Sequence, residues 1–195
     1  MFRVLKERSY EIVKMFINQI AIAIFGIALS IATGSKSTST DLTGYQPATL
    51  QIITSVFAVL FYLFLIFTMM WEIGAKDASR FKHGETGISR LTGFYMGIAA
   101  SSVNFLLAIF ITLGTVFSAI PFFSKLGGIS ATIALLIEGM YTGLLAIRVN
   151  DIPLNSLWFM WFLIMIPMIL TSTLGYLAGI HEFHLFKTFS GQKRE

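Results

Sequence analysis

Long apolar segments alternate with short polar segments along the whole chain. The four longest apolar segments cover about residues 15–33, 50–71, 91–120 and 157–180. Each is close to, or longer than, the ~20 residues with which a helix crosses ~30 Å of hydrocarbon. This repeated length predicts an all-α integral membrane protein whose helices form one bundle, a single domain over residues 1–195.

A fifth apolar segment, residues 129–147, has the length of a span but contains Glu138. An acid at the centre of a spanning helix costs ~2.5–3.5 kcal/mol on insertion scales. Basic residues in short loops favour the cytoplasmic side, and four spans place eleven of the 14 basic residues there, whereas five spans place nine. We therefore predict four transmembrane helices, both termini in the cytoplasm, and a non-crossing extracytoplasmic helix over 129–147 that is re-entrant or interfacial.

Composition narrows the class of protein. Charged residues make up 12% of the chain and hydrophobic residues 55%, with a mean hydropathy of +0.77, whereas soluble domains average about 25% charged residues. The sequence has no cysteine, which excludes disulfides and thiolate metal sites. The net charge of +4 is spread between the apolar segments, a pattern typical of orientation in a membrane rather than of nucleic-acid binding. The lipid bilayer is the expected partner, and no nucleic acid is expected.

The loop over residues 72–90 is the internal segment that is densest in charge. The four-span topology places it in the cytoplasm. Glu72 and Lys76 are spaced i,i+4 in the favourable order, which predicts that the second helix continues beyond the bilayer surface. Together with Asp77 and Arg80, they are candidate residues for contacting a partner. Charges of alternating sign are equally suited to pairing with each other and with lipid headgroups.

The same loop carries a family resemblance. Residues 71–77 read W-E-I-G-A-K-D and are followed by Arg80 and Gly84. This segment resembles the W-E-x-G-x-K-D loop of small, uncharacterised multipass membrane proteins of Gram-positive bacteria. The resemblance implies a bacterial plasma-membrane location and the same coarse architecture, and it implies no activity.

Small and polar residues recur at helical spacing in every apolar segment, which predicts that these faces point into the bundle. Lipid gives helices no hydrophobic drive to associate, so close approach through small residues and hydrogen bonds between helices hold a bundle together. Three small-xxx-small pairs fit this role: Gly93/Gly97, Gly139/Gly143 and Gly175/Gly179.

Two polar residues within the apolar segments are candidate binding residues. An acid in an apolar helix indicates a site for a proton, a cation or a substrate amine, so Glu138 is the first candidate; alternatively, it faces outer water on an interfacial helix. Asn104 lies in the middle of a span. It either lines a path for a solute or forms a hydrogen bond between helices, which contributes around 0.6 kcal/mol in membrane bundles.

The sequence contains no pattern that predicts catalysis. The G-x-S-x-G nucleophile elbow and the Walker A sequence are absent from it. In the segment 181–184, H-E-F-H, the histidines are spaced i,i+3 rather than the i,i+4 of the zinc-protease motif, so we interpret it as an interfacial polar cluster. We expect no enzyme, no cofactor and no bound metal.

These observations favour an accessory or binding subunit of a bacterial membrane complex, whose charged loop over 72–90 faces the partner. That partner is either another membrane protein or a second copy of this chain. The alternative hypothesis is a small-solute transporter or channel that uses Asn104 and Glu138 in the bundle interior.

Overall fold

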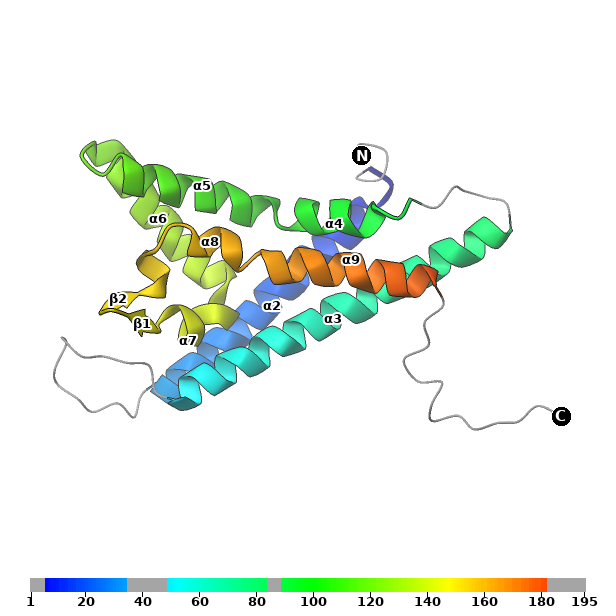
Figure 1. Ribbon diagram of the computed structural model, residues 1–195, viewed down its shortest axis with the longest axis horizontal. Coiled ribbons are helices and arrows are strands. Elements are labelled where there is room, and N and C mark those ends of the chain that lie inside the picture. Colours follow the sequence, from blue (N-terminus) through cyan, green and yellow to red (C-terminus); the bar gives the residue numbers. More distant parts are fainter. Residues whose placement is uncertain (1–5, 35–48, 84–88, 182–195) are drawn as a thin grey trace.

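The computed structural model describes residues 6–34, 49–83 and 89–181, which form one elongated bundle of helices (Figure 1). The first five helices are α2 (Ser9–Gly34), α3 (Thr49–Lys82), α4 (Thr92–Ala100), α5 (Ser102–Val116) and α6 (Pro121–Ile137). The remaining helical elements are η1 (Gly139–Tyr141), α7 (Thr142–Leu145), η2 (Leu154–Ser156), α8 (Met160–Leu163) and α9 (Ile166–Ile180). The predicted helical architecture is therefore confirmed.

Three helical stretches of the described chain are long and apolar enough to cross a membrane: α2, α3 and Met160–Ile180, which contains α8 and α9. Two further pairs of helices meet the same criteria only when each pair is taken together, and both pairs are bent. α4 meets α5 at 53°, and α6 meets the stretch Gly139–Leu145 at 85°. The described residues thus provide three to five candidate spans.

The third predicted span, residues 91–120, is not one tilted helix. The chain is helical only to Val116 and is interrupted at Ser101, so the prediction of one continuous helix is wrong, whereas α4 and α5 together still form a candidate span. Gly and Ser residues are common at helix kinks, and Ser101 stands at this one, where its hydroxyl donates to Sδ of Met168 on α9 at 3.3 Å. The bend therefore forms where the helix meets α9.

The segment 125–128 (K-L-G-G) has the local signal of a turn, but α6 runs through it. The helix begins instead at Pro121, which occupies its first turn, where a proline loses no helical hydrogen bond. At its other end α6 stops before Glu138, and the single helix expected over 129–147 is divided into the end of α6, η1 and α7.

A short hairpin follows α7 and was not predicted from the sequence. Strands β1 (Arg148–Val149) and β2 (Ile152–Pro153) pair antiparallel across a two-residue loop. The loop residues Asn150 and Asp151 have φ values of 50° and 62°. Two-residue hairpin loops of type I′ require positive φ at both positions, and Asn and Asp tolerate it. The sequence signal for this hairpin was the Asn150-Asp151 pair between the β-branched residues Val149 and Ile152.

Glycines bring the helices close together, as predicted from the small-xxx-small pairs. At each of the six glycines in those pairs, an added Cβ would lie within 3.0 Å of an atom of another helical element. Gly175 and Gly179 face the backbone of α3, and α3 and α9 form the most extensive helix pair of the described bundle. A similar approach joins α5 to α6, where Gly114 lies against Gly127.

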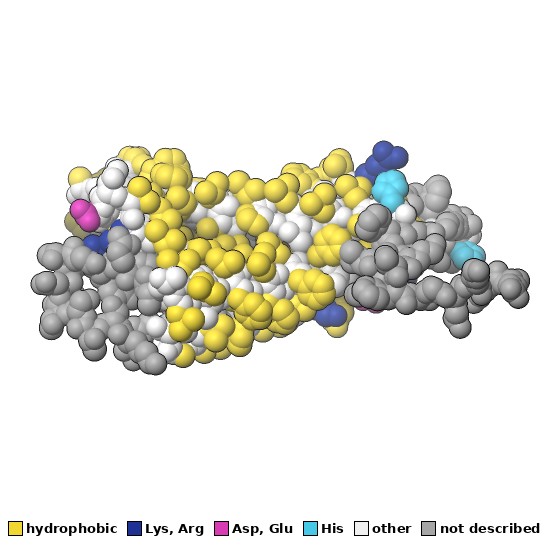
Figure 2. Space-filling view, turned by 60° about the horizontal axis from the view of Figure 1, so that its bottom comes forward, with side chains coloured by type: hydrophobic (Ala, Val, Ile, Leu, Met, Phe, Trp, Pro, Cys, Tyr) yellow, Lys and Arg dark blue, Asp and Glu magenta, His cyan; other side chains and the backbone are white. Residues whose placement is uncertain are grey.

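The surface and the ends of the bundle differ in character. Hydrophobic side chains cover the middle of the face shown in Figure 2, and the charged side chains coloured there lie toward its two ends. Figure 1 shows the end of α2, the start of α3, the α5–α6 turn and the hairpin at one end of the bundle. The start of α2, the end of α3, the start of α4 and the end of α9 lie at the other.

Candidate functional site

Glu138 lies deep inside the bundle, at the bend between α6 and η1, and is only 4% exposed. One carboxylate oxygen, Oε1, accepts two hydrogen bonds: from Nε2 of Gln19 at 2.8 Å and from Nδ2 of Asn104 at 2.6 Å. The two donors come from α2 and α5. The expectation that Glu138 faces outer water is therefore wrong, because the 85° bend turns this residue into the bundle.

Asn104 forms one of the two hydrogen bonds to Glu138. It is 7% exposed, and its amide forms the expected hydrogen bond between helices, from α5 to Glu138. It also lines the pocket around that carboxylate. The structure thus brings together the two candidates that the sequence places 34 residues apart.

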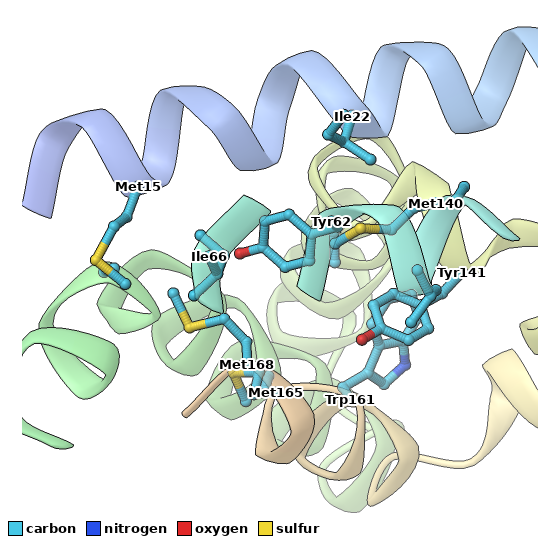
Figure 3. Close-up of a cluster of buried hydrophobic side chains, with 14 of the residues drawn as sticks. Met15, Ile22, Tyr62, Ile66, Met140, Tyr141, Trp161, Met165 and Met168 are labelled. Atoms are coloured by element: carbon cyan, nitrogen blue, oxygen red, sulfur yellow. The ribbon is translucent and has the colours of Figure 1, made fainter. Parts of the chain in front are cut away.

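Two tyrosines complete the polar part of this pocket. Tyr62 on α3 and Tyr141 in η1 are 1% and 5% exposed, and both line the pocket with Glu138. Figure 3 shows them between α2 and the α8–α9 stretch, close to Met165 and Met168. Within the described chain, neither tyrosine hydroxyl has a hydrogen-bond partner, and neither does Oδ1 of Asn104. Three buried oxygen atoms are therefore left unsatisfied around one carboxylate.

The pocket also lies where three helical stretches are interrupted. Its lining includes Ser101 from the α4–α5 bend, Glu138 from the α6–η1 bend, and Ile164 and Met165 from the junction of α8 and α9. Broken helices at membrane depth are tolerated where they line a cavity. In transporters they place free backbone groups at the binding site near the middle of the bilayer.

The charge of Glu138 is not balanced by a basic residue. The residues that line its pocket are all neutral or apolar apart from Glu138 itself, and no ion pair to Glu138 forms within the described part of the chain. Burying an ionised carboxylate without a positive partner is strongly unfavourable. A buried acid in this setting has to take up a proton or bind a cation.

The candidates in the charged segment after Trp71 divide into two groups. Glu72 and Lys76 form the predicted i,i+4 ion pair at 2.6 Å, with side chains 63% and 62% exposed, and Arg80 is exposed as well. They lie on α3, which has 34 residues and a length of about 51 Å at 1.5 Å per residue. The prediction that the second helix continues into the charged segment is confirmed, because α3 runs to Lys82, and its length exceeds the ~30 Å of hydrocarbon.

Asp77, in contrast, has internal partners. It forms an ion pair with Arg8, and its Oδ2 accepts a hydrogen bond from the hydroxyl of Tyr176 at 2.9 Å. Burial lowers the pKa of Arg8, but the nearby carboxylates of Asp77 and Glu11 outweigh this and raise the pKa above its ordinary value. The cluster connects the start of α2 with α3 and α9, so Asp77 contributes to the packing at this end of the bundle.

Of the polar segment 181–184, which resembles a metal-binding motif, the structure describes only His181. Among the described residues, no group of three or more His, Cys, Asp or Glu side chains is placed to hold a metal ion. His181 ends α9 and is exposed, whereas Glu182 and His184 lie outside the described residues.

Sequence reasoning identified Glu138 and Asn104 but not the other polar residues of the pocket. Gln19 and Tyr62 belong to the polar faces expected to point inward, yet nothing in the sequence connects them with a residue on another helix. Tyr141 carried no signal, because its position depends on the interruption of α6.

No family model, no curated protein and no solved structure matches this chain.

Proposed function

We propose that the chain is a transport protein of the bacterial plasma membrane in which Glu138 binds and releases a positive charge, either a proton or a cation. The observation that carries this proposal is the buried carboxylate of Glu138, which has two amide donors and no basic partner among the described residues. A charge taken up there sits inside the bundle. It can be exchanged only when water reaches the pocket from one side of the membrane.

The layout that we propose has four spans and one re-entrant element. The spans are α2, α3, α4–α5 and α8–α9, and the re-entrant element runs from α6 through η1 to α7. The positions of the helix ends support this layout, because the α5–α6 turn and the hairpin after α7 lie at the same end of the bundle (Figure 1). A segment that enters and leaves at one end does not cross, and both termini then lie on the cytoplasmic side.

The bends supply a physical basis for exchange. Glu138 is held by α2 and α5 but belongs to the 85° bend after α6. Loading the carboxylate with a positive charge removes the cost of burying it, whereas unloading restores that cost. The two charge states therefore favour different degrees of closure around the bend, which is the differential stabilisation that a ligand-driven conformational change requires.

The proposal is tested by measuring ion entry into liposomes that contain the purified protein. An inside-negative potassium diffusion potential is imposed, and entry of protons and of Na⁺ is followed with enclosed fluorescent indicators. We expect entry of at least one of the two ions above the protein-free rate. Glu138→Gln should reduce this entry by at least about tenfold, since a loss of 1.4 kcal/mol of stabilisation is already tenfold.

The matched control is Asp151→Asn, which neutralises an exposed acid in the hairpin and keeps a residue that tolerates positive φ. It should transport ions at the wild-type rate. Equal ion entry through the wild type and Glu138→Gln, or no entry of either ion through the wild type, contradicts the proposed function.

The accessory-subunit hypothesis remains as a second proposal. The exposed charges Glu72, Lys76 and Arg80 on the projecting end of α3 support it, whereas the internal ion pair of Asp77 removes one of its four residues. If this surface binds a partner, Lys76→Glu should remove at least one protein that co-purifies with the wild type from bacterial membranes. An unchanged set of co-purifying proteins contradicts this proposal.

A further inference from the structure

The proposed function leaves open whether the positive charge bound at Glu138 is a proton or a metal cation. We propose that the pocket is a site for a dehydrated monovalent cation of the size of Na⁺. The ligands would be the Glu138 carboxylate, Oδ1 of Asn104 and the hydroxyl oxygens of Tyr62 and Tyr141. This inference rests on the proposed function, because it identifies the charge that Glu138 would carry.

Three unsatisfied oxygen atoms in the pocket indicate a bound cation. Oδ1 of Asn104 and the hydroxyls of Tyr62 and Tyr141 have no hydrogen-bond partner among the described residues, and all three residues are more than nine-tenths buried. Buried polar atoms in folded proteins are almost always satisfied, so each exception needs an explanation. A proton on Glu138 would satisfy at most one of these atoms. A cation can be coordinated by all of them together with the carboxylate.

Charge selects a monovalent ion. Glu138 is the only acid in the pocket lining, and the other polar groups there are neutral. Calcium sites collect several carboxylates, and magnesium keeps several of its waters in an octahedral shell. One carboxylate with neutral oxygen ligands balances a single positive charge.

The types of ligand in the pocket and the space between them further limit which cation can bind. The pocket includes the thioethers of Met165 and Met168, which are ligands that favour soft ions such as Cu(I). However, Sδ of Met168 already accepts a hydrogen bond from Ser101, and the carboxylate, amide and hydroxyl oxygens of the pocket are hard ligands that suit hard ions. The space among these groups does not admit a water-sized sphere. A hydrated ion or an organic ammonium therefore does not fit, whereas a small bare ion needs only the gap between its ligands.

The inference is tested by equilibrium binding, which does not depend on transport. The unfolding temperature of the detergent-solubilised protein is measured in NaCl, KCl and choline chloride at equal ionic strength and pH. A ligand that binds only the folded state raises this temperature. At about 100 times the dissociation constant, Na⁺ should raise it by about 5–10 °C over choline, and K⁺ should raise it less.

Two variants identify the ligands. Glu138→Gln should lose the response to Na⁺ completely. The double variant Tyr62→Phe/Tyr141→Phe keeps the shape and the carboxylate but lacks both hydroxyls, and its apparent affinity for Na⁺ should fall at least about tenfold, since 1.4 kcal/mol corresponds to tenfold. An unchanged affinity in the double variant overturns the proposed ligand set, and an equal response to Na⁺ and K⁺ overturns the size of the site.

Failure of this inference can be distinguished from failure of the proposed function. If Na⁺ has no effect on wild-type unfolding while the liposomes still show Glu138-dependent proton entry, the cation site is wrong and the transport proposal stands. If Na⁺ stabilises the wild type and not Glu138→Gln, but neither ion enters the liposomes, the site is correct and the transport proposal is wrong.

Discussion

Replacing Gly179 by alanine will destabilise the protein, whereas the same replacement at Gly128 will stabilise it. A Cβ at Gly179 would overlap the carbonyl oxygen of Trp71 and would lie 2.8 Å from the nitrogen of Ala75. These are backbone atoms, so relief requires α3 and α9 to separate. Overpacking of this kind costs typically ~1–3 kcal/mol. At Gly128, in α6, nothing lies within 4 Å of the added methyl group, and alanine gains about 1 kcal/mol of helix propensity over glycine.

The measurement is the unfolding temperature of each variant in one detergent, together with the fraction of protein that stays monodisperse after heating. At about 2–4 °C per kcal/mol for a chain of this size, Gly179→Ala should unfold several degrees below the wild type and Gly128→Ala slightly above it. The two variants add the same methyl group to a helix, so the comparison isolates the contact. Equal shifts at the two positions contradict the close packing of α3 against α9.

Features that depend on local spacing could be predicted from the sequence. The small-xxx-small glycines and the Glu72–Lys76 pair are set by the 3.6-residue period of a helix, so neighbours three or four residues apart show which faces pack or pair. The helical architecture also followed from segment length. Each of these predictions required knowledge of a single helix only.

The errors occurred where a distant part of the chain determines local structure. Pro121 directly follows the apolar segment 91–120, although it begins α6. Two consecutive glycines such as Gly127 and Gly128 are a local turn signal, although Gly127 packs against Gly114 of the preceding helix. A proline or glycine has the same local signal in either role, and only the neighbouring helix decides between them.

The candidate site also depends on contacts between distant parts of the chain, which local sequence patterns do not predict. Gln19 and Glu138 are 119 residues apart in sequence, yet they share a hydrogen bond. The sequence indicates that a buried acid is costly, but not whether partners exist that make its burial tolerable. The charged segment after Trp71 drew attention through its density of charge. In the structure the less conspicuous polar residues on separate helices converge, whereas Asp77 is engaged within the bundle.

The second large effect is expected at Glu138, where two substitutions should change stability in opposite directions. In Glu138→Gln, the side-chain oxygen can still accept the hydrogen bonds from Gln19 and Asn104, and the new amide group can donate to an unsatisfied oxygen such as that of Tyr62. The buried charge is removed at the same time.

In Glu138→Leu, both amide donors lose their acceptor, which costs about 1–3 kcal/mol for each group left unsatisfied. At about 2–4 °C per kcal/mol, the leucine variant should unfold about 4–24 °C below the wild type, and the glutamine variant at or above it. The comparison is made in choline chloride so that no cation stabilises the wild type, and both variants are expected to lose ion entry. A glutamine variant as unstable as the leucine variant would show that the negative charge itself stabilises the fold, and Glu138 would then be a structural residue rather than a binding residue.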